Sequence, residues 1–272
     1  MTHIGENYSV KIQKYYFCNG TYSAACSFGS LIQLFVSPLQ LILFPELSKL
    51  YDENKIDEIV IYMSHSLRYF LLISLPPVFG LSVLAKPLLR IFTTQDFISG
   101  WLVIPIIALS GLLAGIVQIF VNTLLVVKKT KVPTYINFSA AILNVLINLL
   151  LIPLVGIVGA ALSTLLSYFF MAALCTHISL KYFKHNFYSH DIAKSIMSSV
   201  AMYFFVSHFE ILSILKLIEV AGMGVLVYLF MMFLLGGFRD HELSLTPIFV
   251  SRLCSTKKST IFYQNLMTNT VF

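Results

Sequence analysis

Long stretches of this sequence carry no charged residue, and this feature limits the possible folds more than any motif does. Residues 17–45, 101–127 and 132–180 contain no Lys, Arg, Asp or Glu. About 20 consecutive apolar residues are enough for a helix to cross the hydrocarbon core of a bilayer. The whole chain agrees, because 58% of its residues are hydrophobic and 11% are charged, whereas soluble proteins have about 25% charged residues. We therefore predict an integral membrane protein.

The longest uncharged run, residues 132–180, is too long for one crossing and contains the break "PLVG" at 153–156. We expect two helices joined by a tight turn there. The runs do not alternate apolar and polar residues as the strands of a membrane barrel do. The sequence thus predicts an all-α, polytopic membrane helix bundle of about seven spans. The predicted spans are residues 17–45, 66–92, 101–127, 132–152, 156–180, 192–209 and 211–235.

The Lys and Arg residues are distributed unevenly between alternate loops. Most of the 18 basic residues fall in the loops 46–65, 128–131 and 181–194 and in a C-terminal tail, 236–272. Because loops rich in Lys and Arg stay in the cytoplasm, we expect a cytoplasmic C-terminus and a short outer N-terminal tail, 1–16. The chain is then a multi-pass protein of the cytoplasmic membrane. Its net charge of +6 points to no nucleic-acid partner, since basic loops facing anionic membrane lipids account for it.

Residues that usually perform catalysis or hold a metal form no pattern in this sequence. The four cysteines make no CxxC pair and no spacing suited to zinc. A glycine-rich phosphate loop, an HExxH motif and a serine elbow are all missing from the sequence. We therefore expect no metal, no cofactor and no enzymatic activity.

Amide side chains inside the predicted spans are the most informative polar residues. Gln118 and Asn122 are four residues apart in the third span, and Asn137, Asn144 and Asn148 share one helical face in the fourth. An amide that faces lipid leaves its donors and acceptors unpaired, at a cost of several kcal/mol. Both faces should therefore point into protein or into a wet cavity. Two interpretations stay open: the amides form hydrogen bonds between helices, or the two pairs Gln118–Asn122 and Asn144–Asn148 line a path that binds a hydrophilic cargo.

Small residues and prolines in the spans indicate where helices pack closely or bend. Glycines and alanines leave a helix surface nearly without side chains, so that two backbones can approach each other. A proline inside a helix removes one backbone hydrogen bond and is a potential kink site. The residues expected to act in helix packing or as hinges are Pro76, Pro77, Pro153, Gly156, Gly159 and Ala160.

Two basic residues, Lys86 and Arg90, lie one helical turn apart near the outer end of the second predicted span. One interpretation is that their side chains extend to the lipid headgroups, with Asp96 as a partner. The other is that they form part of the substrate-binding cavity and attract the pyrophosphate of a lipid-linked sugar.

Several stretches of the sequence are similar to the second half of the polysaccharide flippases, which belong to the multidrug/oligosaccharidyl-lipid/polysaccharide exporter superfamily. The resemblance runs from about residue 19 to residue 239. Its most specific part is the stretch with two asparagines, a proline, glycines and alanines. The similar stretches are "YSAACSFGSLIQLFVSPLQLILFPELSKLYD", "LPPVFGLSVLAKPLL", "IPIIALSGLLAGI" and "LNVLINLLLIPLVGIVGAALSTLLSY". The positions that match the family pattern directly are Asn144, Asn148, Pro153, Gly156, Gly159 and Ala160.

The resemblance implies a two-lobed transporter in which helices surround a central cavity. Members of the family move a lipid-linked oligosaccharide from the cytoplasmic leaflet to the outer leaflet, where envelope polysaccharide is assembled. The first span here is similar to the family's eighth helix, so the chain is expected to hold one lobe without its opening helix. The expected partners are a lipid-linked oligosaccharide and membrane lipids, and a separate chain that carries the N-terminal half is an open alternative.

Three alternatives to flipping by this chain stay open. Half a transporter fits an inactive remnant or a non-transporting partner subunit of a split flippase. A drug or cation antiporter of the same superfamily needs carboxylates inside the membrane, and Glu219 is the one candidate. A membrane polysaccharide polymerase would be expected to have a sizeable outer loop, whereas the predicted outer loops are short.

Overall fold

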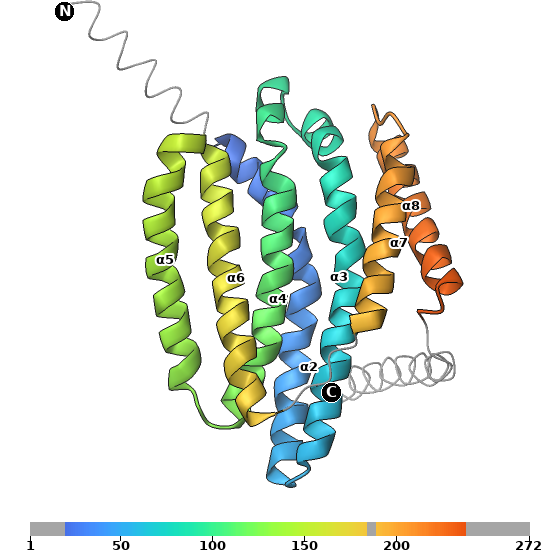
Figure 1. The fold of residues 1–272 in the computed structure, drawn as a ribbon. Coiled ribbons are helices and arrows are strands. Elements are labelled where there is room, and N and C mark those ends of the chain that lie inside the picture. The colour runs from blue at the N-terminus through green and yellow to red at the C-terminus, as the bar shows by residue number, and fades with distance from the viewer. Residues whose placement is uncertain (1–19, 184–188, 238–272) are drawn as a thin grey trace, which may run out of the picture.

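A computed structural model describes residues 20–183 and 189–237 of the chain as a bundle of helices that run roughly parallel to one another (Figure 1). Residues 20–29 are helical and continue through the short 3-10 helix η1 into α2. The elements are η1 (Ser30–Ile32), α2 (Gln33–Asp52), α3 (Ile56–Phe92), η2 (Gln95–Gly100), α4 (Val103–Val126), α5 (Lys131–Val155), α6 (Ile157–Tyr182), α7 (Ser189–Ser207) and α8 (Ile214–Leu234).

The fold class predicted from the sequence, a helical membrane bundle, is confirmed. Among the described residues, α3, α4, α5, α6 and α8 are long and apolar enough to cross a membrane. The other two long helices, α2 and α7, do not meet the same measure and pack within the bundle. The predicted tail 1–16 and residues 238–272 of the predicted C-terminal tail lie outside the described residues.

Two predicted loops are largely helical in the structure. The region 46–65 was expected to be a loop, but α2 continues to Asp52 and α3 begins at Ile56. Hydrophobicity indicates which residues lie in the hydrocarbon, but a helix can continue beyond the bilayer. Helix α3 has 37 residues, about 55 Å of helix, which is longer than the hydrocarbon core of about 30 Å. The predicted turn 153–156 shrinks to Gly156, since α5 includes Pro153 and α6 begins at Ile157. A proline in the last helical turn removes only one backbone hydrogen bond.

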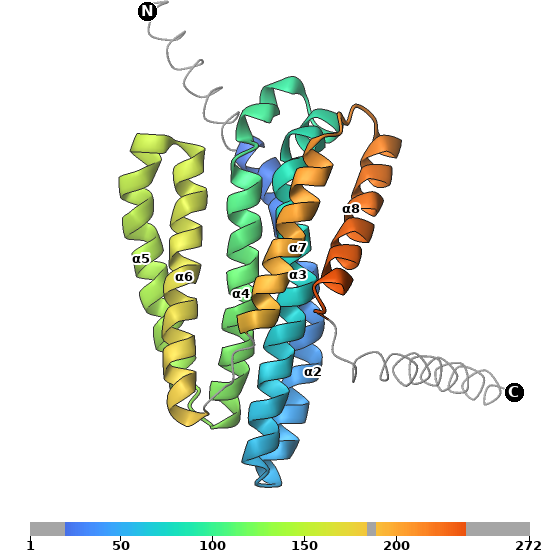
Figure 2. The same cartoon turned by 45° about the vertical axis from the view of Figure 1, so that its right-hand side comes forward.

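The helices form a central group with one pair on each flank. Helix α4 contacts α2, α3 and α6. On one side α6 lies against α4 and carries α5, which forms the edge of the bundle (Figure 1). On the other side α7 packs on α3, and α8 packs chiefly on α7 (Figure 2). The bundle therefore consists of the group α2–α3–α4, the pair α5–α6 and the pair α7–α8.

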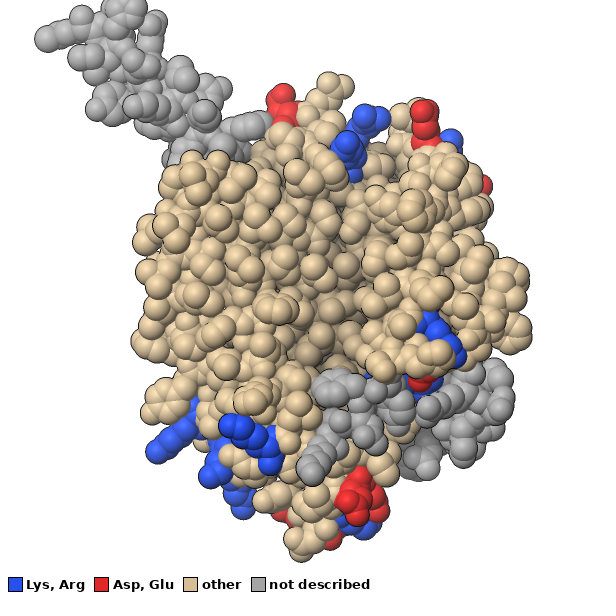
Figure 3. Space-filling model, in the orientation of Figure 1, with Lys and Arg blue, Asp and Glu red and all other residues tan. Residues whose placement is uncertain are grey.

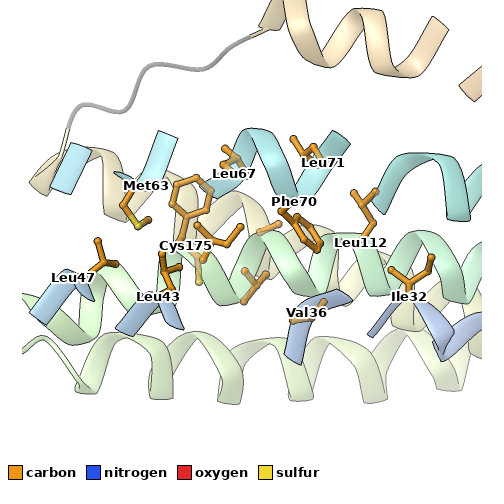
Figure 4. Packing of buried hydrophobic residues seen from close by; sticks show 14 of the residues in the cluster. Ile32, Val36, Leu43, Leu47, Met63, Leu67, Phe70, Leu71, Leu112 and Cys175 are labelled. Atoms are coloured by element: carbon orange, nitrogen blue, oxygen red, sulfur yellow. The ribbon is translucent and has the colours of Figure 1, made fainter. Parts of the chain in front are cut away.

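The main hydrophobic core lies where α2, α3, α4 and α6 meet (Figure 4). Most charged side chains on the face shown in Figure 3 gather at its two ends, and a wide uncharged belt separates them. This distribution suits a protein whose middle is surrounded by lipid. The buried residues labelled in Figure 4 are Ile32, Val36, Leu43, Leu47, Met63, Leu67, Phe70, Leu71, Leu112 and Cys175.

Candidate functional site

An apolar groove with a volume of about 600 Å³ lies between α2, α3, α7 and α8. Leu34 and Phe35 of α2 line one wall, and Ala221, Val225 and Leu229 of α8 line the other. Nearly all of the exposed lining is apolar. A groove of this chemistry accepts a hydrocarbon chain and offers almost no partner to a polar group.

This apolar groove continues along α2 and α3 into two other hollows, both of which are more polar than the groove. A second hollow of about 300 Å³ shares Leu34, Phe35 and Ile73 with the groove. A third, of about 530 Å³, adjoins the second at Tyr62 and Tyr69. We call the three together the α2–α3 furrow. Its polar end is lined by Glu46, Glu58, Tyr62, His65, Ser66 and Tyr69.

Prolines in α3 change the backbone chemistry along the furrow. Pro76 and Pro77 have no N–H, so the carbonyls of Leu72 and Ile73 lose the donor that a regular helix supplies four residues later. The Tyr228 hydroxyl of α8 donates to the Leu72 carbonyl at 2.8 Å. Of the predicted hinge residues, Pro76 and Pro77 thus lie in the wall of the groove.

The amides of α5 lie in the contact between α5 and α6. Asn148 Nδ2 donates to Asn144 Oδ1 at 3.0 Å, and the Ser163 hydroxyl of α6 lies 2.6 Å from Asn148 Oδ1. Asn137 is exposed, and no hydrogen bond joins it to Asn144 or Asn148 within the described residues. Asn144 and Asn148 are half-buried and lie outside the α2–α3 furrow.

The amides of α4 form a second pair at a different place. Gln118 Nε2 lies 3.5 Å from Asn122 Oδ1, and Asn122 is 3% exposed. The expectation that the two amide pairs lie on adjacent helices is wrong, because α6 lies between α4 and α5 (Figure 1). Helices α4 and α5 follow each other in the sequence, but α6 packs against both of them and separates most of their length.

The glycines that follow the α5 amides have separate structural reasons. Gly156 has φ 63° and ψ −136°, a backbone conformation that residues with a Cβ rarely adopt. At Gly159 an added Cβ would lie 2.5 Å from the Leu151 carbonyl oxygen. Together they let the chain reverse at one residue and bring α6 against α5. Pro153 and Ala160 lie on the two sides of this turn.

The two predicted outer cations do not pair with Asp96 in the structure. Lys86 Nζ lies 4.4 Å from the centre of the Trp101 ring, a cation–π arrangement. Arg90 is exposed, and no ion pair joins either cation to Asp96 within the described residues. Both cations lie outside the furrow.

A buried ion pair near the other end of α3 was not recognised in the sequence. Arg68 Nε lies 2.8 Å from Asp191 Oδ2, and the two side chains are 1% and 9% exposed. Arg68 lies inside the predicted span 66–92, and Asp191 precedes the predicted span 192–209 by one residue. A charge close to an apolar run is a usable signal, but nothing in the sequence identifies its partner.

Comparison with known proteins shows which family the sequence matches. The family model described as "Lipid II flippase MurJ" matches residues 21–235. The probable low-salt glycan biosynthesis flippase Agl15 of Haloferax volcanii is 25% identical over 213 residues, 77% of this chain and 45% of that protein. The probable lipid II flippase MurJ of Rickettsia prowazekii is 32% identical over 150 residues, 53% of this chain and 29% of that protein.

A solved structure supports the same fold. The lipid II flippase MurJ in an inward closed conformation matches with a TM-score of 0.64 and 20% identity, over 78% of this chain and 46% of that one. This chain therefore spans less than half the length of these relatives.

Proposed function

The chain belongs to the lipid II flippase MurJ family, and on that premise we propose that it forms part of a transporter that flips lipid-linked oligosaccharide across the cytoplasmic membrane for envelope polysaccharide synthesis. The observation that carries the proposal is the α2–α3 furrow, which is almost wholly apolar at one end and more polar at the other, where Glu46, Glu58 and His65 line it. A lipid-linked saccharide has the same division, with a hydrocarbon part and a hydrophilic head.

In this arrangement the lipid chain lies in the apolar groove and the head enters the polar hollows. Tyr62 and Tyr69 present aromatic rings and hydroxyls to the head. Such side chains combine an apolar surface with hydrogen bonding, which suits sugars. Bare hydrocarbon makes the passage of a charged sugar head very costly, so a protein wall that offers polar partners lowers that barrier.

The furrow needs a second wall to exclude lipid from the head. We propose that the other half of the transporter supplies that wall, either on the same chain or as a separate partner. The supporting observation is that the matched relatives are about twice as long as the matched region of this chain. A partner subunit that does not transport alone is the second candidate function.

Transport is tested with proteoliposomes that contain a lipid-linked oligosaccharide with a fluorophore on the sugar. Flipping moves the fluorophore between leaflets, where a membrane-impermeant quencher reaches it. We expect faster quenching than in protein-free vesicles. Ala221→Trp should abolish the gain, because Ala221 lines the apolar groove. The matched control is Gly222→Trp, since the Cβ of residue 222 meets open space outside the groove.

The outcomes separate the two candidate functions. Quenching that Ala221→Trp blocks and Gly222→Trp leaves intact supports flipping by this chain. If the unaltered chain gives the rate of protein-free vesicles, flipping by this chain alone is wrong and the partner-subunit function is favoured. Co-reconstitution with the other half then tests the partner function directly.

The four amides and the outer cations Lys86 and Arg90 stay in the proposal as candidate contacts for the cargo, although they lie outside the α2–α3 furrow. The bond between Ser163 and Asn148 favours hydrogen bonding between helices over a cargo path for the α5 pair. In a complete and active flippase, Asn144→Leu with Asn148→Leu distinguishes the two roles. Lower abundance indicates a packing role, whereas lower export at normal abundance indicates contact with cargo.

We also propose that the end of the bundle with the α4–α5 turn faces the cytoplasm, because that turn carries Lys128, Lys129 and Lys131. A cysteine at Lys129 should react with a membrane-impermeant thiol reagent only after cells are permeabilised. A cysteine at Gln95, in η2 at the opposite end, should react in intact cells. The reverse pattern would contradict the orientation.

A further inference from the structure

Polar contacts attach the α7–α8 pair to α3 at two levels. At the first level, Arg68 of α3 forms an ion pair with Asp191 of α7, and Arg68 Nη2 donates a hydrogen bond to the Gly237 carbonyl beyond α8 at 3.2 Å. Lys194 Nζ of α7 donates to the Gly236 carbonyl at 2.8 Å. One guanidinium thus contacts both members of the pair, and two cations meet the carbonyl end of α8, where they also complement its dipole.

At the second level, the Tyr228 hydroxyl joins the same three helices. It donates to the Leu72 carbonyl of α3, the carbonyl freed by Pro76. The Ser195 hydroxyl of α7 lies 2.9 Å from the same Tyr228 oxygen. Since that hydroxyl hydrogen goes to Leu72, Ser195 acts as the donor to Tyr228.

These contacts lie directly beside the apolar groove. Tyr228 lines it, as do Met202 of α7 and Leu229 of α8. One wall of the groove is therefore the pair that the polar contacts attach to α3, while the opposite wall comes from η1 and α2. Any rotation of α7–α8 on α3 changes the width of the groove.

A buried ion pair contributes little net stability, because the desolvation of two charges offsets their attraction. Its directionality is greater than that of apolar packing, since a guanidinium that contacts a carboxylate and a carbonyl together has few allowed orientations. Apolar residues of similar volume would fill the same space without defining one orientation.

We propose that Arg68 and Asp191 are positioning residues that hold the α7–α8 pair in one orientation on α3 and thereby set the width of the apolar groove. The inference deepens the proposed function, and rests on it only for the role of the groove in carrying the lipid. It concerns the shape of the groove and is measured without transport.

The test is the distance across the groove in the full chain. Spin labels introduced as unnatural amino acids at Leu34 and Leu229, which line opposite walls, report that distance. In Arg68→Met with Asp191→Leu, no charge is left unpaired. We expect the mean Leu34–Leu229 distance of this double variant to shift by about 1–2 Å, as in helix shifts of switching proteins, with a broader distribution. Labels at Leu34 and Leu109 of α4 should keep the parental distance.

The matched control removes an exposed ion pair. Lys55 Nζ lies 2.9 Å from Glu53 Oε2 in the α2–α3 turn, and Lys55→Gln with Glu53→Gln should leave the Leu34–Leu229 distribution unchanged. If the Arg68–Asp191 double variant does not fold, Arg68→Lys replaces it. A lysine keeps the charge but cannot span Asp191 and Gly237 with a planar fork, so the distribution should still broaden.

The distance results decide the inference, and transport decides the proposed function. A parental Leu34–Leu229 distribution in the folded double variant, or in Arg68→Lys if the double variant does not fold, overturns the inference. A changed distribution supports the inference whether or not the variant still flips lipid at the parental rate. A changed distribution together with a parental flipping rate would contradict the proposal that the groove carries the cargo.

Discussion

The two helix pairs on the flanks of the bundle are attached to the central helices by different kinds of contact. The pair α7–α8 meets α3 through a buried ion pair and a tyrosine hydroxyl. The pair α5–α6 meets the central group through α6, whose buried residues are all small. These are Gly159, Ala161, Ser163, Ser167, Ala172, Cys175 and Ser179.

The difference matters because the two kinds of contact restrict motion differently. Small residues bring helix backbones together through many weak contacts that change little when one helix slides. Charged and proline-freed groups have few alternative partners in an apolar interior, so their contacts favour one orientation. We expect α7–α8 to have a more strictly defined orientation on the bundle than α5–α6.

The largest expected effect is the loss of one member of the buried ion pair. Arg68→Met alone leaves the Asp191 charge buried and unpaired, and should lower the free energy of unfolding by about 3–5 kcal/mol. Thermal unfolding in detergent measures it. Arg68→Met with Asp191→Leu should recover most of that loss. A double variant as unstable as the single one would show that the site requires the ions themselves.

The next effect concerns the close contact within α5–α6. Gly159→Ala places a Cβ 2.5 Å from the Leu151 carbonyl oxygen, and such overpacking costs about 1–3 kcal/mol. The same thermal measurement applies. Gly222→Ala is the control, because its added Cβ has nothing within 4 Å. Equal midpoints for both variants would mean that α5 moves away from α6 without cost.

A comparable loss is expected at the proline-freed carbonyl. Tyr228→Phe removes both the donor to Leu72 and the acceptor for Ser195, and should cost about 1–3 kcal/mol, the net worth of two hydrogen bonds. Tyr203→Phe is the control. It removes a tyrosine hydroxyl in α7 that has no hydrogen bond among the described residues. If Tyr203→Phe is as destabilising as Tyr228→Phe, the hydroxyl at 228 has no special role.

The smallest effect should come from the amide contact between α5 and α6. Ser163→Ala removes the hydroxyl 2.6 Å from Asn148 Oδ1, and bonds of this kind in membrane proteins are worth about 0.6 kcal/mol. Thr134→Ala is the control, because the hydroxyl of Thr134 in α5 donates to the Thr130 carbonyl four residues earlier and has no other hydrogen bond among the described residues. A loss larger than that of Tyr228→Phe would show that a polar contact inside the α5–α6 pair contributes more stability than the polar contact that attaches α8 to α3.

Part of the candidate site was within reach of the sequence, and the rest was not. The glycines at 156 and 159 stood out in the sequence, because a run of small residues after a break in a span is typical of helices whose backbones approach closely. The α2–α3 furrow was missed, because its lining comes from helices far apart in the sequence. The prolines of α3 were predicted as kink or hinge sites, but the sequence did not show that Tyr228 would donate to the carbonyl that Pro76 leaves free.

The sequence by itself determined that this protein is a helical membrane bundle, because each span is apolar over its own length. The likeness to flippases came from the resemblance of particular stretches such as residues 143–168. The tertiary structure decided that α6 separates the two amide pairs, that Arg68 meets Asp191, and that α7–α8 forms one wall of a groove. Lipid tails are as apolar as a protein core. The hydrophobicity that reveals a span therefore does not reveal which of its sides meets another helix.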